Sequence, residues 1–258
     1  RGNMGLYKKE SARLFDIFGE FSPAVERISL DEAFLDLTGS ARLMGPAKQV
    51  GERLRKRVHD QLTLPISVGI APVKMVAKIA SAAAKPDGLL EVIASEMKQF
   101  LDPLPVGRIW GVGPVAQERL EALGFYTIGD VAHAKDDDLH HALGDWGIEI
   151  AQLARGEDIR DIEPYREAVS YSEEHTFVKD VTAKHELEPL VREHAESVAR
   201  RLRHDGVRAH TVVLKWKSAQ RNAPGARGYP VFTRRTTLTQ PTDDGRTIAE
   251  NAIGLLHR

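Results

Sequence analysis

The sequence has 258 residues, and 42% of them are hydrophobic, which is enough to fill the cores of two or three small domains. Its 36 Lys and Arg nearly balance 37 Asp and Glu, so overall charge neither favours nor excludes a polyanionic partner. The absence of Cys excludes disulfides and thiolate sites, and no apolar run reaches the ~20 residues that span a bilayer, which predicts a cytoplasmic protein without a membrane partner.

The first third of the chain predicts helices and strands in the order αββαβαβ. Apolar residues three and four apart predict an amphipathic helix over residues 7–21. Two apolar runs at 25–30 and 33–38 then predict a β-hairpin. A helix opened by Pro46, a strand at 65–71, a helix that begins near Met75 and a strand at 89–93 complete the order.

The rest of the chain predicts a helical segment, a linker and a second α+β segment. Residues 96–158 are helical in pattern and broken by glycines, whereas the polar residues 159–168 predict a linker. The order βαββα follows, with a strand at about 169–178, a helix at 186–204, strands at 211–217 and 231–239, and a helix from about 246.

Two adjacent acids, Asp31 and Glu32, lie where the predicted hairpin turns. Neighbouring carboxylates repel, so such a pair needs solvent or a cation. Successive side chains of a strand face opposite ways, so both acids serve one site only if the backbone turns or bulges there. Magnesium prefers carboxylate and phosphate oxygens, and two ions ~4 Å apart can activate a hydroxyl and stabilise a leaving pyrophosphate. From the pair alone, an ordinary solvated acidic turn remains the alternative.

Three longer segments resemble the Y-family translesion DNA polymerases, with bacterial DNA polymerase IV as the nearest branch. They are Ser29-Leu-Asp-Glu-Ala-Phe-Leu-Asp-Leu-Thr38, Ser67-Val-Gly-Ile-Ala-Pro-Val-Lys-Met-Val-Ala-Lys-Ile-Ala-Ser81 and Ala84-Lys-Pro-Asp-Gly88. The similarity continues through Leu104-Pro-Val-Gly-Arg-Ile-Trp-Gly-Val-Gly113 and residues 166–180. It therefore covers essentially the whole chain.

This resemblance implies an α+β fold with three domains. Residues 1–95 would form a ferredoxin-like palm without its first strand, and 96–158 a helical thumb with a helix-hairpin-helix. Residues 159–168 would link these to a ferredoxin-like little finger at 169–258, without its last strand. The missing opening strand would carry another metal-binding aspartate, so the chain is expected to be a segment that does not polymerise in isolation.

The resemblance also implies site residues. Asp31 and Glu32 would bind two Mg²⁺ ions, with Glu32 also catalytic, and Lys85 would contact the triphosphate of the incoming nucleotide. Alone, Lys85 is more typical of a cation that opposes the dipole at a helix C-terminus. Lys74 and Lys78, four residues apart on one helix, are candidates for DNA contact, with a solvated helix face as the alternative.

Two further segments predict DNA contacts. Gly111 and Gly113 lie between helical segments, where glycines let backbone N–H groups approach a phosphate, although an ordinary interhelical turn has the same pattern. Between Arg200 and Arg235 there are ten Lys and Arg but one acid. Alternation there predicts one strand face with Val212, Leu214 and Trp216 and another with Thr211, Val213, Lys215 and Lys217. Four arginines lie on or beside the neighbouring hairpin, and the whole group predicts sequence-tolerant phosphate binding: Arg221, Arg227, Arg234 and Arg235.

The function implied is template-directed DNA synthesis past lesions. The implied partners are primer–template DNA, deoxynucleoside triphosphates and, for the full-length protein, a sliding clamp, with a monomer as the expected state. The alternatives are a non-catalytic, polymerase-like DNA-binding protein and a nucleotide cyclase with a related palm. Retention of Asp31, Glu32 and Lys85 argues against the first, and the Gly111 turn and basic last segment are unexplained by the second.

Overall fold

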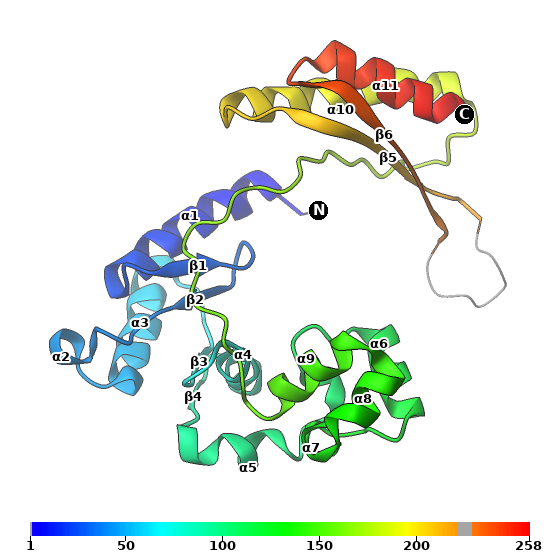
Figure 1. Cartoon of the computed structure of the whole chain (residues 1–258). Coiled ribbons are helices and arrows are strands. Elements are labelled where there is room, and N and C mark those ends of the chain that lie inside the picture. Colours follow the sequence, from blue (N-terminus) through cyan, green and yellow to red (C-terminus); the bar gives the residue numbers. More distant parts are fainter. Residues whose placement is uncertain (1, 221–228) are drawn as a thin grey trace. The chain divides into compact units, whose positions relative to one another are not determined.

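The computed structural model describes residues 2–220 and 229–258, which divide into two compact units at residues 166 and 167 (Figure 1). Unit 1 begins with α1 (Met4–Phe21), β1 (Val25–Arg27), β2 (Ala33–Leu35), α2 (Ala41–Met44), α3 (Ala47–Leu62), β3 (Val68–Ile70), α4 (Lys74–Ala83) and β4 (Leu89–Glu91). The predicted order αββαβαβ is confirmed, with the short helix α2 in addition. No described helix has the length and apolar character needed to cross a membrane.

Apolar spacing explains the helices of this first half. Apolar residues three and four apart in α1 and α3 are buried in one cluster over the hairpin: Leu14, Phe15, Phe18, Phe21, Val50, Leu54 and Val58. The strands form two separate pairs, since β1 and β2 are antiparallel whereas β3 and β4 are parallel. Among the described residues no strand joins the two pairs into one sheet.

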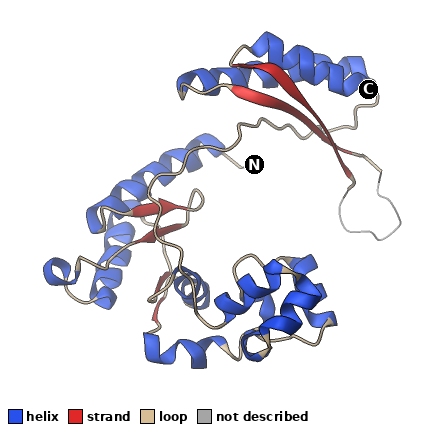
Figure 2. Ribbon diagram, in the orientation of Figure 1, coloured by secondary structure: helices blue, strands red, loops and turns tan. Residues whose placement is uncertain are grey.

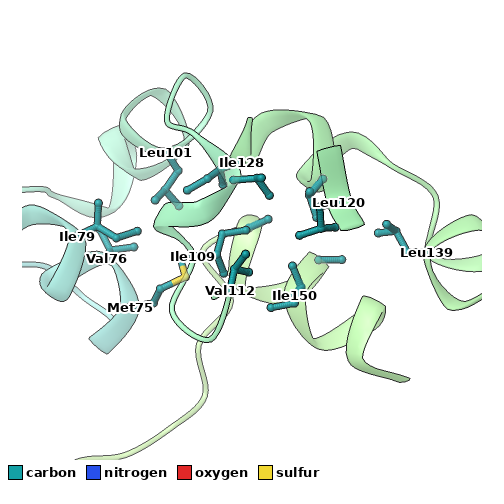
Figure 3. Packing of buried hydrophobic residues seen from close by; sticks show 14 of the residues in the cluster. Met75, Val76, Ile79, Leu101, Ile109, Val112, Leu120, Ile128, Leu139 and Ile150 are labelled. Carbon is teal, nitrogen blue, oxygen red and sulfur yellow. The ribbon is translucent and has the colours of Figure 1, made fainter. Parts of the chain in front are cut away.

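The second half of unit 1 is helical, as predicted. It comprises η1 (Ala94–Glu96), α5 (Met97–Leu101), η2 (Val106–Arg108), α6 (Pro114–Ala122), α7 (Ile128–His133), α8 (Asp136–Leu143) and α9 (Asp145–Ala154). Its core is continuous with α4, because Met75 and Ile79 of that helix pack in one cluster with Leu101, Ile109 and Leu120 (Figure 3). This shared core fixes the helical part against α4.

Unit 2 packs α10 (Lys184–His204) and α11 (Gly245–His257) on one face of the antiparallel pair β5 (Ala209–Lys217) and β6 (Val231–Thr242) (Figure 2). The strand predicted at 169–178 is wrong, because the structure has no strand there. Side chains of α10 hold this segment instead: Arg201 donates to Ser172 O at 2.7 Å, and Ser197 donates to Glu173 at 3.0 Å. Its polar residues find partners on a helix rather than in a ladder.

Candidate active site and nucleic-acid interface

The acidic pair lies in the turn between β1 and β2, where the strand alternation ends. The last strand pair is Arg27 with Ala33, and the backbone N–H groups of Ile28 and Ser29 both donate to Glu32 O, at 2.9 and 3.3 Å. The Ser29 hydroxyl donates to Asp31 Oδ1 at 2.6 Å. Asp31 and Glu32 are both exposed. The backbone therefore turns at the point where two adjacent carboxylates need a turn to serve one site.

Lys78 on α4 contacts this turn. Its Nζ lies 3.1 Å from Glu32 Oε2, and the Lys78 and Glu32 side chains are 30% and 46% exposed. The same ammonium lies 5.7 Å from the centroid of the Trp110 ring. The structure thus brings together a predicted metal ligand, a predicted DNA-contacting lysine and an aromatic ring from the helical half of unit 1.

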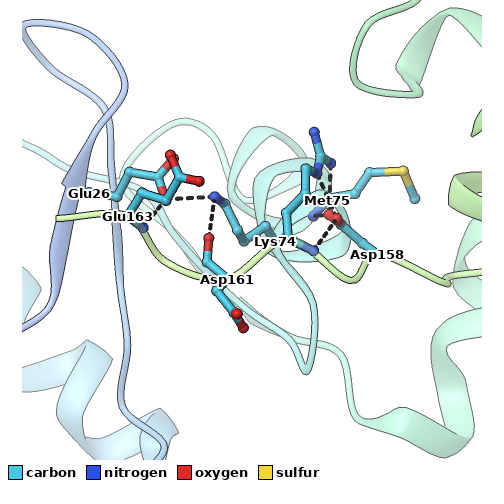
Figure 4. Close-up of polar contacts among 7 residues, drawn as sticks. Glu26, Lys74, Met75, Asp158, Asp161 and Glu163 are labelled. Carbon is cyan, nitrogen blue, oxygen red and sulfur yellow. Dashed lines mark hydrogen bonds and ion pairs between the residues drawn. The ribbon is translucent and has the colours of Figure 1, made fainter. Parts of the chain in front are cut away.

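Lys74, also predicted to contact DNA, lies in the interior instead. Its Nζ is 2.6 Å from Glu26 Oε2 and donates to Asp161 O at 2.9 Å, and the residue is 8% exposed (Figure 4). Burial raises the pKa of Glu26, but hydrogen bonds from Lys74 and from the Glu163 backbone outweigh it and lower that pKa overall. Lys74 joins three segments of unit 1, and its ammonium is already satisfied.

Lys85 lies in the turn after α4 and is exposed. Its ammonium has no ion pair within residues 2–220 and 229–258. Lys85 follows Lys78 by seven residues and lies two residues past the end of α4 at Ala83. A flexible lysine just beyond the helix that carries Lys78 can reach a ligand of triphosphate size that also approaches the acidic turn.

The chemistry of the acidic turn fits part of a magnesium site. The described residues contain no group of three or more His, Cys, Asp or Glu arranged to hold a metal ion. Magnesium, however, keeps several waters and binds through one or two carboxylates together with substrate phosphates. Asp31 and Glu32 supply two such carboxylates on an exposed turn.

Gly111 and Gly113 precede α6 in an open turn. Gly111 has φ +103°, a conformation that favours glycine, and a Cβ at either position would meet nothing within 4 Å. Gly113 is the N-cap of α6 and Pro114 follows at the first helical position. The first N–H groups of a helix attract anions, so this open turn can approach a phosphate.

The cations of unit 2 divide between two faces of the β5–β6 pair. Lys215, Lys217 and Arg235 are exposed on the face that carries Val213, as the alternation predicts. Arg234 lies on the other face, where it donates to Leu255 O at 2.8 Å and lies 5.0 Å from the Trp216 ring centroid. Arg221 and Arg227 lie outside the described residues. Three predicted contacts therefore share an open cationic face, and Arg234 holds the last turn of α11.

Sequence reasoning missed the residues that follow α9, here called the palm strap (residues 158–163). Asp158 is 8% exposed and accepts from Met75 N at 3.0 Å (Figure 4). It also accepts from Arg160 Nε and Nη2 at 2.6 and 2.7 Å. The predicted linker range begins one residue later, and its first part is fastened to unit 1. The available signal was an acid and an arginine two residues apart in an otherwise polar stretch.

Comparisons with known proteins agree along the whole chain. Residues 1–82 match the impB/mucB/samB family, 94–125 match the IMS family HHH motif, and 168–258 match the impB/mucB/samB family C-terminal domain. DNA polymerase IV of Desulfatibacillum aliphaticivorans is 40% identical over 252 residues, which are 98% of this chain and 62% of that protein. DNA polymerase IV of Caulobacter vibrioides is 36% identical over 256 residues, with 98% and 61% covered.

Solved structures agree on the fold. A Y-family DNA polymerase chimera superposes with a TM-score of 0.82 at 19% identity, covering 99% of this chain and 71% of that chain. The insertion ternary complex of Dbh DNA polymerase gives a TM-score of 0.60, also at 19% identity, with 99% and 71% covered. The chain thus has the fold of these polymerases, and it spans about three fifths of the length of the Desulfatibacillum and Caulobacter proteins.

Proposed function

Because this chain belongs to the impB/mucB/samB family, we propose that it supplies the acidic turn, thumb and little finger of a translesion DNA polymerase. The observation that carries the proposal is the exposed turn with Asp31 and Glu32. In it, Glu32 Oε2 lies 3.1 Å from Lys78 Nζ on α4, the helix that leads to Lys85. Carboxylates for a cation then lie on a turn beside α4, and a lysine for phosphates follows the end of that helix. This combination suits a nucleoside triphosphate.

In the proposed reaction, the 3′-hydroxyl oxygen of a primer forms a bond to the α-phosphorus of the nucleotide. The bond from that phosphorus to the bridging oxygen of the β-phosphate breaks, pyrophosphate leaves and the hydroxyl proton passes to solvent. Asp31 and Glu32 would hold Mg²⁺, which when bound favours loss of that proton and neutralises the leaving pyrophosphate. Lys85 would bind the triphosphate through its point charge.

The direct test is primer extension by a completed polymerase, which we define as this chain joined after the N-terminal segment of the Desulfatibacillum relative. With Mg²⁺ and four deoxynucleoside triphosphates, we expect template-directed extension on undamaged and abasic templates. A completed polymerase that binds primer–template tightly without extending it would instead support a non-catalytic DNA-binding protein.

The cationic face of unit 2 should supply salt-sensitive DNA affinity. We expect the triple substitution Lys215→Gln, Lys217→Gln and Arg235→Gln to make the slope of log affinity against log salt concentration less steep by about 2 to 3. Each phosphate contact contributes ~0.9 to the steepness of that slope. Fluorescence anisotropy of a labelled primer–template between about 50 and 200 mM salt measures this slope. Sequence preference should not change, because such contacts read no bases.

Arg234→Gln is the matched control, since Arg234 is on the same strand but faces α11. It should lower the melting temperature of unit 2 and leave the salt slope unchanged. An equal loss of slope in this variant would place the phosphate contacts elsewhere. Sliding-clamp binding and a monomeric state stay predictions for the longer protein.

A further inference from the structure

The palm strap provides the cap that α4 does not supply itself. Val73, the N-cap residue of α4, makes no side-chain cap hydrogen bond. Asp158 accepts from Met75 N at 3.0 Å in its place, and its side chain is 1% exposed. A carboxylate at a helix N-terminus accepts a hydrogen bond from a free N–H group, and its negative charge interacts favourably with the helix dipole. The strap therefore fixes the start of the helix that carries Lys78.

Arg160 extends this contact to Trp110. Its guanidinium forms two parallel hydrogen bonds with Asp158 and lies 4.3 Å from the Trp110 ring centroid. The Trp110 ring lies 5.5 Å from the ring of Phe34 in β2, two residues after Glu32. Arginine stacks on aromatic faces in this manner, and two hydrogen bonds to a carboxylate restrict the rotation of the guanidinium.

The same indole is the surface beside which Lys78 lies. Lys78 Nζ is 5.7 Å from the ring centroid and 3.1 Å from Glu32 Oε2. A lysine has a flexible four-carbon stem, so a fixed ring on one side restricts where its ammonium can go. A continuous path of contacts thus runs Asp158, Arg160, Trp110, Lys78, Glu32.

We propose that Arg160 is a positioning residue for the acidic turn, holding Trp110 so that Lys78 keeps the Glu32 carboxylate in place. The proposal rests on the function proposed above, because it gives that turn its task. Reactive groups need support from residues that lock their rotamers, and misplacement by about 1 Å can cost up to ~100-fold in rate. We expect Arg160→Gln to lower kcat about 10-fold with little change in the KM for nucleotide.

The first test reads geometry without activity, by NMR of the 258-residue chain. In the unmodified chain the ring current of Trp110 should shift the ε-methylene protons of Lys78 upfield, with Lys78→Gln assigning the signal. Arg160→Gln should return that signal toward the free-lysine value and leave exposed Lys85 unchanged. A Lys78 signal that stays in place while the Asp158 and Met75 amides move would overturn the proposal.

The second test is a double-mutant cycle in the completed polymerase. If Arg160 acts through Lys78, adding Arg160→Gln to Lys78→Gln should cause no further loss of kcat. Arg155→Gln is the control, since Arg155 also pairs with an acid, Asp136, at 2.6 Å but lies on no path to Lys78; its effect should add independently. Additive losses for Arg160 would limit it to a structural role.

A second set of variants tests the proposal even if the Arg160→Gln protein does not fold. Trp110→Leu breaks the same path and keeps the Arg160–Asp158 contact, and Trp110→Phe restores an aromatic face. We expect Leu to lower kcat and Phe to recover most of it; equal activities would contradict the proposal. If extension is absent while the NMR shift behaves as expected, the proposed function fails and the positioning contact stands.

Discussion

Replacing Glu32 by Gln in the completed polymerase is expected to lower the rate of primer extension by at least about 1,000-fold. The amide keeps the size of the side chain but removes the negative charge that a divalent cation requires, and loss of such charge stabilisation costs several kcal/mol in the transition state. About 4 kcal/mol corresponds to a factor of 1,000. Asp31→Asn should have a similar effect, and single-turnover extension measures both.

This loss should not come from unfolding. The Lys78–Glu32 pair is partly exposed, with side chains 30% and 46% accessible, and such pairs contribute about 0–1 kcal/mol to stability. Glu52→Gln on the exposed side of α3 is the matched control and should extend primers at the unmodified rate. If Glu32→Gln extends within about threefold of the unmodified enzyme, the turn has no role in the chemistry.

Asp158→Ala should destabilise unit 1 by about 3 kcal/mol. Removing one partner of a buried ion pair typically costs 3–5 kcal/mol, and we take the lower end because the Arg160 side chain is 42% exposed while that of Asp158 is 1% exposed. The substitution also frees the Met75 N–H group. Urea denaturation measures the change, with the transition of unit 1 followed by the fluorescence of Trp110 and Trp146 in a Trp216→Phe background that removes the signal of unit 2.

Acidic pH should reduce the contribution of the Asp158 carboxylate to the stability of unit 1. Burial raises the pKa of Asp158, but hydrogen bonds from Arg160 and the Met75 backbone, with the charge of Arg160, outweigh it and lower that pKa overall. A lowered folded pKa gives stability that is present above the unfolded value of about 3.9 and is lost as the pH falls through the folded pKa. The free energy of unfolding of the Asp158→Asn variant should therefore approach that of the unmodified chain below about pH 4.

Asp136→Asn separates burial from simple pairing. Asp136 is 2.6 Å from Arg155, a distance like that between Asp158 and Arg160, but its side chain is 52% exposed. We expect a loss below about 1 kcal/mol. Equal losses for Asp136 and Asp158 would mean that burial and the contact with Met75 add nothing.

Helices with an apolar stripe could be predicted because burial of that stripe decides their conformation. Phe15 and Phe18 in α1 and Val58 in α3 are buried where their spacing places them. The first hairpin strand was predicted too long at the turn, since β1 ends at Arg27, whereas the second begins at Ala33 as predicted and ends earlier, at Leu35. At the turn, Ile28 and Ser29 donate to Glu32 O, which turns the chain before residue 30.

Charged residues were harder to assign, because a sequence gives the charge but not its partner. Lys74 and Lys78 differ by one helical turn, yet Lys74 is buried against Glu26 while Lys78 reaches Glu32. Arg234 and Arg235 are adjacent and face opposite sides of one strand. Asp158 lies in a polar stretch whose composition is typical of a linker, and its partner Met75 lies 83 residues earlier.

The remote cap on α4 has a consequence for the order in which a ribosome can complete this fold. Met75 emerges from the ribosome 83 residues before Asp158. Glu26, which accepts a hydrogen bond from the backbone N–H group of Glu163, emerges 137 residues before Glu163. At about 5–20 residues per second, α4 waits roughly 4–17 seconds for its cap. The hairpin and α4 thus reach their final arrangement only after the helical half has been synthesised, so translation sets the earliest time at which the acidic turn is held in place.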